Sequence, residues 1–142
     1  MEGVRIERVS RRKDSVEDYY RLYAILKSTL SVYLMGISKL ETVKSQTLKS
    51  YAVFLGDNVV GGDVLQDEGD VAYLAFIGLT DMVRNKGLGK LMVEHMKEQA
   101  IEIGRDRIRA ETEHTNVPLF KRLGFKEYYP CDKGSVAMHL DI

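Results

Sequence analysis

An apolar run, a basic glycine-rich turn and an apolar-periodic segment follow one another in the second half of the chain, and they constrain the fold most. Val71–Thr80 has the length and composition of a buried strand. The turn contains Gly87 and Gly89, and apolar residues then recur at helical spacing as far as Ile103. A strand that turns directly into a helix gathers unpaired N–H groups at one point, and the helix dipole adds partial positive charge. The segment is therefore predicted to bind an anion such as a phosphate.

The residue types of this turn fit an anion site. Gly87 and Gly89 carry no Cβ, so a ligand can approach the backbone closely. Arg84, Lys86 and Lys90 supply positive charge around the same point. The phosphate-loop motif of nucleotide hydrolases needs a Ser or Thr after its Gly-Lys pair, and here a leucine follows. A dinucleotide fold wants a parallel sheet, whereas the strands expected before this turn form an antiparallel meander. The structural alternative is a glycine turn that binds nothing.

Composition limits the class of protein. The 142 residues fit one domain, 1–142, and 44% apolar with 30% charged residues is ordinary for a soluble globular chain. Because 21 basic residues balance 21 acidic ones, global charge gives no reason to expect a nucleic-acid or membrane partner. The single cysteine, Cys131, excludes an internal disulfide and a multi-cysteine metal site. The sequence has no signal peptide and no apolar stretch of membrane-spanning length, so we expect a cytoplasmic protein without a metal.

The rest of the chain predicts one α/β domain with a mixed sheet. Strands are expected at Val4–Val9, Tyr51–Leu55, Val59–Gln66, Val71–Thr80, Arg107–Thr112, Phe125–Tyr129 and Ser135–Ile142. Helices are expected at Val16–Leu34, at Leu40–Leu48, after the glycine turn, and at Pro118–Leu123 with Asn116 or Thr115 as its cap. Gly78, inside a strand, suggests a bulge or a close backbone approach.

Several side chains at helical spacing have both a structural and a functional interpretation. Tyr19, Tyr20 and Tyr23 fall on one helix, where tyrosines are more often half-buried packing residues than the lining of a substrate cleft. The helix expected after the glycine turn has one broad apolar face, which consists of Leu88, Leu91, Met92, His95, Met96, Gln99 and Ile103. His95 lies on this face. We interpret it as a core or boundary histidine rather than a catalytic one.

Two motifs resemble those of the GNAT superfamily, the acyl-CoA-dependent N-acyltransferases. Residues 84–89, R-N-K-G-L-G, match the Arg/Gln-x-x-Gly-x-Gly/Ala signature of that family. Residues 119–125, L-F-K-R-L-G-F, resemble its second signature, usually Leu-Tyr-x-Lys-x-Gly-Phe. The order of the expected elements also matches, so the resemblance spans nearly the whole chain. It implies a GNAT fold of the α/β (α+β) class, with a mixed, mostly antiparallel sheet of about seven strands flanked by about four helices.

The resemblance also implies a cofactor, acetyl-CoA, and the residues that contact it. In the family the backbone of the glycine turn holds the pyrophosphate, and the pantetheine arm lies beside the preceding strand like an added strand. The residues carried over as contacts are Ile77, Leu79, Arg84, Lys86, Gly87, Leu88, Gly89, Lys90, Asn116 and Phe120. Leu88 is the expected buried anchor. The Leu79 N–H is the expected donor to the thioester oxygen, a role that can contribute about 3–4 kcal/mol.

The chemistry implied is direct attack of a primary amine on the thioester. An alkyl amine has a pKa of about 10.4, so only about one molecule in several thousand is unprotonated at pH 7 and a general base is useful. Many relatives carry a glutamate on the strand before the glycine turn, but Val71–Thr80 contains no acidic residue. The candidates are Glu111, Glu113 and His114, at the end of the strand that borders the acyl site. Either glutamate is equally well a solvated charge at the sheet edge.

Phe120 departs from the family pattern, in which a tyrosine at this position protonates the leaving thiolate. Phenylalanine keeps the packing and lacks the proton, and the sequence does not place a substitute donor. The resemblance as a whole nevertheless implies an N-acetyltransferase acting on a small amine or on a protein N-terminus or lysine. The alternative is a GNAT-fold module that binds acyl-CoA with little turnover. A homodimer is compatible with the resemblance, although the sequence carries no interface signal.

Overall fold

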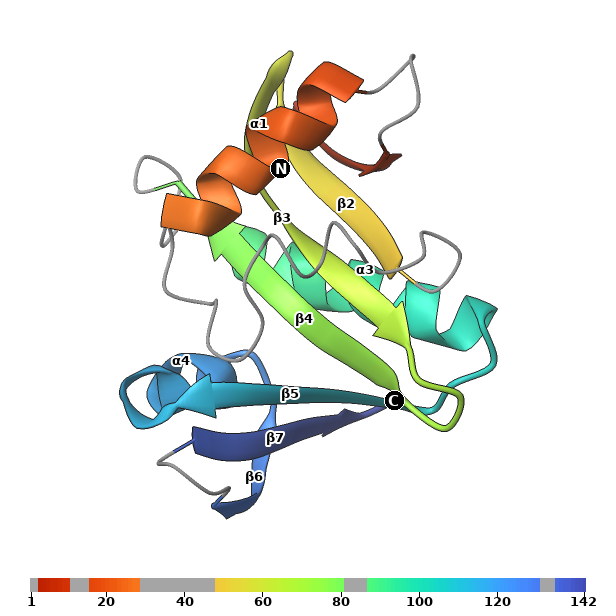
Figure 1. The fold of residues 1–142 in the computed structure, drawn as a ribbon, viewed down its shortest axis with the longest axis vertical. Helices are drawn as coiled ribbons and strands as arrows, with labels where there is room; N and C mark the ends of the chain where they lie inside the picture. The colour runs from red at the N-terminus through yellow and green to blue at the C-terminus, as the bar shows by residue number, and fades with distance from the viewer. Residues whose placement is uncertain (1–2, 11–15, 29–47, 81–86, 131–134) are drawn as a thin grey trace.

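The computed structural model describes residues 3–10, 16–28, 48–80, 87–130 and 135–142. The strands in these ranges form one seven-stranded sheet in the order β1-β2-β3-β4-β5-β7-β6 (Figure 1). The strands are β1 (Val4–Val9), β2 (Leu48–Leu55), β3 (Asn58–Asp67), β4 (Ala72–Leu79), β5 (Arg107–Glu113), β6 (Lys126–Pro130) and β7 (Ser135–Asp141). The β4–β5 pair is parallel and the other five neighbouring pairs are antiparallel. The mixed, mostly antiparallel sheet of seven strands is confirmed.

Three α-helices lie in the described part of the chain, where about four were expected. They are α1 (Val16–Ser28), α3 (Leu88–Glu102) and α4 (Val117–Arg122), and the short 3-10 helix η2 (His114–Asn116) precedes α4. The expected helix Leu40–Leu48 falls outside the described residues except for Leu48, which begins β2. The last part of the expected helix Val16–Leu34 also falls outside them.

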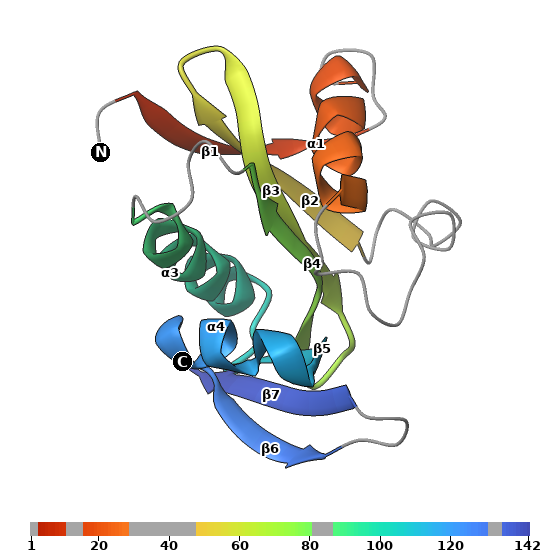
Figure 2. The same ribbon diagram turned by 90° about the vertical axis from the view of Figure 1, so that its left-hand side faces the viewer.

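The helices cover opposite faces of the sheet (Figure 2). On the first face, α1 packs on β2, β3 and β4, and Leu22 is fully buried in that layer. We call this the α1 face. On the other side, α3 and α4 bury the apolar residues of β4, β5 and β7 in the largest core cluster. We call this the α3 face.

The tyrosines of α1 and the apolar face of α3 follow the predicted spacing with two exceptions. Tyr19 and Tyr23 are buried as packing residues, whereas Tyr20 is exposed. Leu91, expected on the buried face of α3, is 39% exposed. The buried residues of α3 are Leu88, Met92, Val93, Met96 and Ala100. Consequently the buried arc of this helix is shifted toward Val93.

A bulge interrupts the β3–β4 ladder, but not at Gly78. Val64 pairs with Phe76 while Leu65 pairs with Leu74, so Ala75 is the extra residue of β4. Gly78 pairs regularly with Gly62, so the bulge suggested for it is wrong. The close backbone approach, the other possibility, is present, because an added Cβ on Gly61 would overlap the Gly78 carbonyl oxygen. Gly61 and Gly62 of β3 both have close neighbours, and an added Cβ on Gly62 would lie 2.6 Å from Leu22 Cδ1. Glycine in the centre of β3 therefore lets α1 approach the sheet closely.

Candidate cofactor and active site

The start of α3 leaves its first N–H groups without a side-chain cap. Gly87 is the N-cap residue, with a left-handed φ of 79°, and it offers no side-chain hydrogen bond. The first intrahelical bond runs from the Leu91 N–H to the Gly87 carbonyl at 3.4 Å. The N–H groups of Leu88, Gly89 and Lys90 precede it and have no acceptor within the helix. The dipole of the 15-residue helix adds partial positive charge at this end, so the start of α3 suits an anionic group.

The two glycines of the turn have different structural reasons. Gly87 needs the left-handed conformation, and an added Cβ there would meet no atom within 4 Å. An added Cβ on Gly89 would lie 3.0 Å from Leu123 Cδ2, so Gly89 lets α3 and the end of α4 approach each other. Leu88 between them is 1% exposed, as expected for an anchor. Lys90 is exposed, while Arg84 and Lys86 lie outside the described residues.

β4 and β5 pair at only one end. Their parallel register consists of Ala72 with Ile108 and Tyr73 with Arg109. Beyond Tyr73, after the bulge at Ala75, β4 continues to Leu79 with no further partner on β5 (Figure 1). The two strands therefore diverge toward the end of β4 that leads to α3. A bulge bends a strand and increases its twist, which is consistent with this divergence.

The peptide groups of Ile77 and Leu79 point away from β3. The Thr80 N–H donates to the Val60 carbonyl at 2.8 Å, so the peptide of Thr80 faces β3. Because alternate residues of an antiparallel strand direct their N–H and C=O groups to opposite sides, those of Leu79 and Ile77 face the side of β5. A ligand that lies beside β4 like an added strand needs this orientation.

Buried and partly exposed side chains alternate along β5. Ile108, Ala110 and Thr112 are buried on the α3 face. Glu111 therefore lies on the opposite face, with intermediate exposure. Glu113 and His114 are exposed at the end of the strand. Of the three candidate bases, only Glu111 is half-buried.

α4 supplies packing rather than a polar group. Phe120 is 5% exposed, belongs to the largest core cluster, and meets the Phe125 ring edge-on at 5.3 Å between centroids. Asn116 occupies the N-cap position of α4, but its side chain makes no capping hydrogen bond. The predicted cap is thus correct in position and wrong in its hydrogen bond.

A buried carboxyl on the α3 face was missed at the sequence level. Asp63 of β3 is fully buried, and no described residue hydrogen-bonds either of its oxygens. Burial raises its pKa to about 8. It pairs with Tyr51, whose hydroxyl donates to Gln99 Oε1 of α3 at 2.9 Å and whose ring meets His95 edge-on. Burial also lowers the pKa of His95, which supports its interpretation as a boundary residue. An aspartate inside an apolar run was the available signal.

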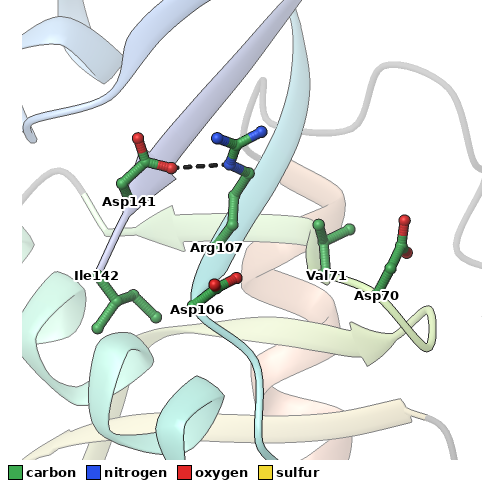
Figure 3. Close-up of a pocket in the computed structure, with 6 residues that line it drawn as sticks. All are labelled: Asp70, Val71, Asp106, Arg107, Asp141 and Ile142. Carbon is green, nitrogen blue, oxygen red and sulfur yellow. Dashed lines mark hydrogen bonds and ion pairs between the residues drawn. The ribbon is translucent and has the colours of Figure 1, made fainter.

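The pocket of about 460 Å³ in Figure 3 lies at the opposite end of β4 from the glycine turn. Its lining residues are Asp70, Val71, Asp106, Arg107, Asp141 and Ile142. Arg107 Nε donates to Asp141 Oδ1 at 2.7 Å, and this hydrogen bond lowers the pKa of the Asp141 carboxyl. The pocket is thus acidic and remote from the cation-rich turn. Among the described residues, no group of three or more His, Cys, Asp or Glu side chains is arranged to hold a metal ion.

Comparison with known proteins identifies the family. The profile of the Acetyltransferase (GNAT) family matches residues 14–125, so the chain belongs to this family. A Bacillus subtilis acetyltransferase in complex with CoA is similar to it, with 21% identity, a TM-score of 0.70, and coverage of 98% of this chain and 99% of that chain. The ribosomal-protein-S18-alanine N-acetyltransferase of Escherichia coli is also similar, with 18% identity, a TM-score of 0.72, and coverage of 98% of this chain and 94% of that chain.

A GNAT family acetyltransferase from Elizabethkingia anophelis with acetyl-CoA bound shares 10% identity and a TM-score of 0.73, over 100% of both chains. These likenesses establish the fold. No curated protein sequence matches this chain. No helix in the described ranges is long and apolar enough to span a membrane.

Proposed function

We propose that the protein transfers an acetyl group from acetyl-CoA directly to a primary amine. The observation that carries the proposal is the divergence of β4 from β5 beside the uncapped start of α3. Together they offer backbone donors for a pyrophosphate and a strand edge for a pantetheine arm. Two proteins of similar fold hold CoA and acetyl-CoA, which supports the same ligand here.

The residues proposed to hold acetyl-CoA come from β4, from α3 and the turn before it, and from the segment of η2 and α4. The N–H groups of Leu88, Gly89 and Lys90 contact the pyrophosphate, with charge from Arg84 and Lys86. The peptide groups of Ile77 and Leu79 contact the pantetheine, and Asn116 and Phe120 border it on the side of α4. The thioester supplies an acetyl group that is activated toward amines.

Glu111 is the proposed general base. Its position on the α1 face matters because α3 and α4 fill the other face of β5, so an acceptor must approach from the α1 face. A half-buried carboxylate there can accept the proton that an attacking amine loses. The Leu79 N–H is proposed to donate to the carbonyl oxygen of the thioester as that oxygen gains charge.

The absence of a hydroxyl at Phe120 favours a second candidate function, an acyl-CoA-binding module with little turnover. The ring is buried among apolar residues, so α4 brings no proton donor through this side chain. A thiol with a pKa of about 8.5 is nonetheless a fair leaving group and can take its proton from solvent. Loss of the acid is therefore expected to slow the reaction rather than prevent it.

Thiol release from acetyl-CoA, measured across a panel of peptides, polyamines and small amines, tests the proposal. We expect Glu111→Gln to lower kcat on the best acceptor by about 10²-fold, since general bases typically contribute that much. Glu113→Gln, on the same strand and exposed, is the matched comparison and should stay within about twofold. Equal losses in both variants would remove Glu111 from the mechanism. Tight CoA binding with no thiol release on any amine would establish the binding module instead.

A further inference from the structure

One row of side chains crosses the α1 face where β4 and β5 begin to diverge. Tyr73 of β4 and Arg109 of β5 form the last pair of the parallel register, and His139 of β7 lies opposite Arg109. Residues paired in this way share a face. The guanidinium of Arg109 lies 5.8 Å from the centre of the Tyr73 ring, which confirms this for the first pair. Arg109 therefore lies between the rings of Tyr73 and His139, at the point where β4 and β5 last pair before they diverge.

The donors of Arg109 are only partly used. In the described part of the chain its hydrogen bonds run through Nη2 alone, to Glu68 Oε1 and Oε2 at 3.3 Å each. Its buried Nε has no acceptor there, and the side chain is 43% exposed. By contrast, Arg105 Nε donates to Asp67 at 2.9 Å and Arg107 Nε to Asp141 at 2.7 Å. Charge-assisted bonds usually measure about 2.7–2.9 Å, so Arg109 is held more loosely than its neighbours.

The position of Arg109 relates it to the proposed base. Glu111 lies two residues further along β5, on the same face, which is about 7 Å along the strand toward the open end. An acceptor on this face therefore meets a carboxylate and then a guanidinium. We propose that Arg109 determines acceptor specificity by binding a carboxylate on the same molecule whose amino group lies at Glu111. The inference rests on the proposed function for the identity of the amine as the acetyl acceptor.

The surroundings of Arg109 favour a carboxylate over a phosphate dianion. Glu68 already places a carboxylate on the guanidinium, so that group fits the space. With Glu68 and Glu111 nearby, a second negative charge on the ligand would add repulsion. The Glu68 contact is an ion pair of partly exposed side chains, worth at most about 1 kcal/mol. An acceptor carboxylate can therefore share or replace it, and a turn of the guanidinium would give Nε its missing acceptor.

Matched acid and amide acceptors test the inference. The probes are β-alanine, 4-aminobutyrate and 6-aminohexanoate, each compared with its own carboxamide, and kcat/KM is measured by thiol release. We expect the best acid to exceed its amide at least about tenfold, the effect of one charge-assisted hydrogen bond. Arg109→Gln should remove that preference by lowering kcat/KM for the acid and leaving the amide within about twofold. Arg107→Gln replaces an arginine on the same face whose side chain is 41% exposed, close to the value for Arg109, and should keep the preference.

A binding arm separates this inference from the proposed function. CoA-saturated protein is titrated calorimetrically with 6-aminohexanoate and its amide, for wild type, Arg109→Gln and Arg107→Gln, and melting temperatures verify that each variant is folded. If no amine releases thiol but the acid binds through Arg109, the proposed function fails and the carboxylate site stands. If wild type treats acid and amide alike in both arms, or if Arg109→Gln weakens both equally, the inference is wrong.

Discussion

The two faces of the sheet treat charged groups differently. On the α3 face, Asp63 is sealed among apolar residues, and burial raises its pKa to about 8, so it is mainly protonated at neutral pH. On the α1 face, Glu111 and Arg109 of β5 keep contact with solvent. A neutral, sealed carboxyl cannot take a proton from an amine, whereas a half-exposed carboxylate can. Substitutions on the α3 face should therefore change the stability of the fold, and those of β5 residues on the α1 face should change turnover.

Replacement of Asp63 has the largest expected effect and tests the buried carboxyl on the α3 face. The folded pKa of about 8 lies above the ordinary 3.8, so the folded state binds the proton more tightly. The stability that the Asp63 carboxyl contributes is therefore full below pH 3.8 and is lost as the pH rises to about 8, where the loss levels off. The loss is on the order of 5 kcal/mol at pH 9. Asp63→Asn and Asp63→Leu should both flatten the pH dependence, measured by urea unfolding between pH 4 and pH 9.

The pH dependence is the readout because each replacement also brings its own packing cost. Asp57→Asn, in the exposed turn between β2 and β3, is the control and should follow the wild-type curve. Parallel curves for wild type and both Asp63 variants would mean that the carboxyl finds a partner in solution. The contrast between the two faces would then be lost.

Gly87→Ala should separate cofactor binding from stability. A left-handed conformation costs an L-residue about 1–2 kcal/mol, and the strain should disturb the donors at the start of α3. Loss of one hydrogen bond to a charged group weakens binding about tenfold. Gly104→Ala is the matched control at the other end of α3, because Gly104 has φ 80° and equally open surroundings. Both variants should lose similar stability, but only Gly87→Ala should bind CoA less tightly in calorimetry.

Asp67→Asn has the smallest expected effect and the opposite pH dependence. Asp67 lies on β3 with Asp63, but hydrogen bonds from Arg105 and from the Gly69 N–H lower its pKa. The stability it contributes is therefore present above the ordinary pKa of 3.8 and is lost as the pH falls below that value. An ion pair of this exposure is worth about 0.5 kcal/mol. Unfolding between pH 3 and pH 6 should show a shallower acid limb for the variant. A change on the alkaline side would contradict the assignment.

Local patterns in the sequence predicted the elements well. The seven strands and the helix after the glycine turn appear close to their expected bounds, because alternating and helical apolar spacing are local properties. The uncapped helix start at Gly87 follows from the glycine turn in the same way. The sequence alone did not choose among Glu111, Glu113 and His114 as the base, and only the intermediate exposure of Glu111 in the structure distinguishes it.

What the sequence did not reveal depends on neighbouring elements. The bulge at Ala75 is a mismatch between β3 and β4, and a single strand does not encode it. Asp63 is buried because helices cover both faces of β3, which turns a polar residue in an apolar run into a sealed one. Leu91 is exposed because α3 turns Val93 toward the core instead. The sequence did not indicate a role for Arg109, because its position beside Tyr73 depends on the parallel register of two segments that are distant in the sequence.

Amide chemical shifts in a CoA titration test whether the start of α3 and the edge of β4 bind CoA. A ¹⁵N-labelled chain of 142 residues is within reach of standard two-dimensional spectra. We expect the largest saturable shifts on Gly87, Leu88, Gly89 and Lys90 and, along β4, on Ile77 and Leu79. Saturable binding that leaves these amides unchanged, or the absence of binding at millimolar CoA, would contradict this expectation.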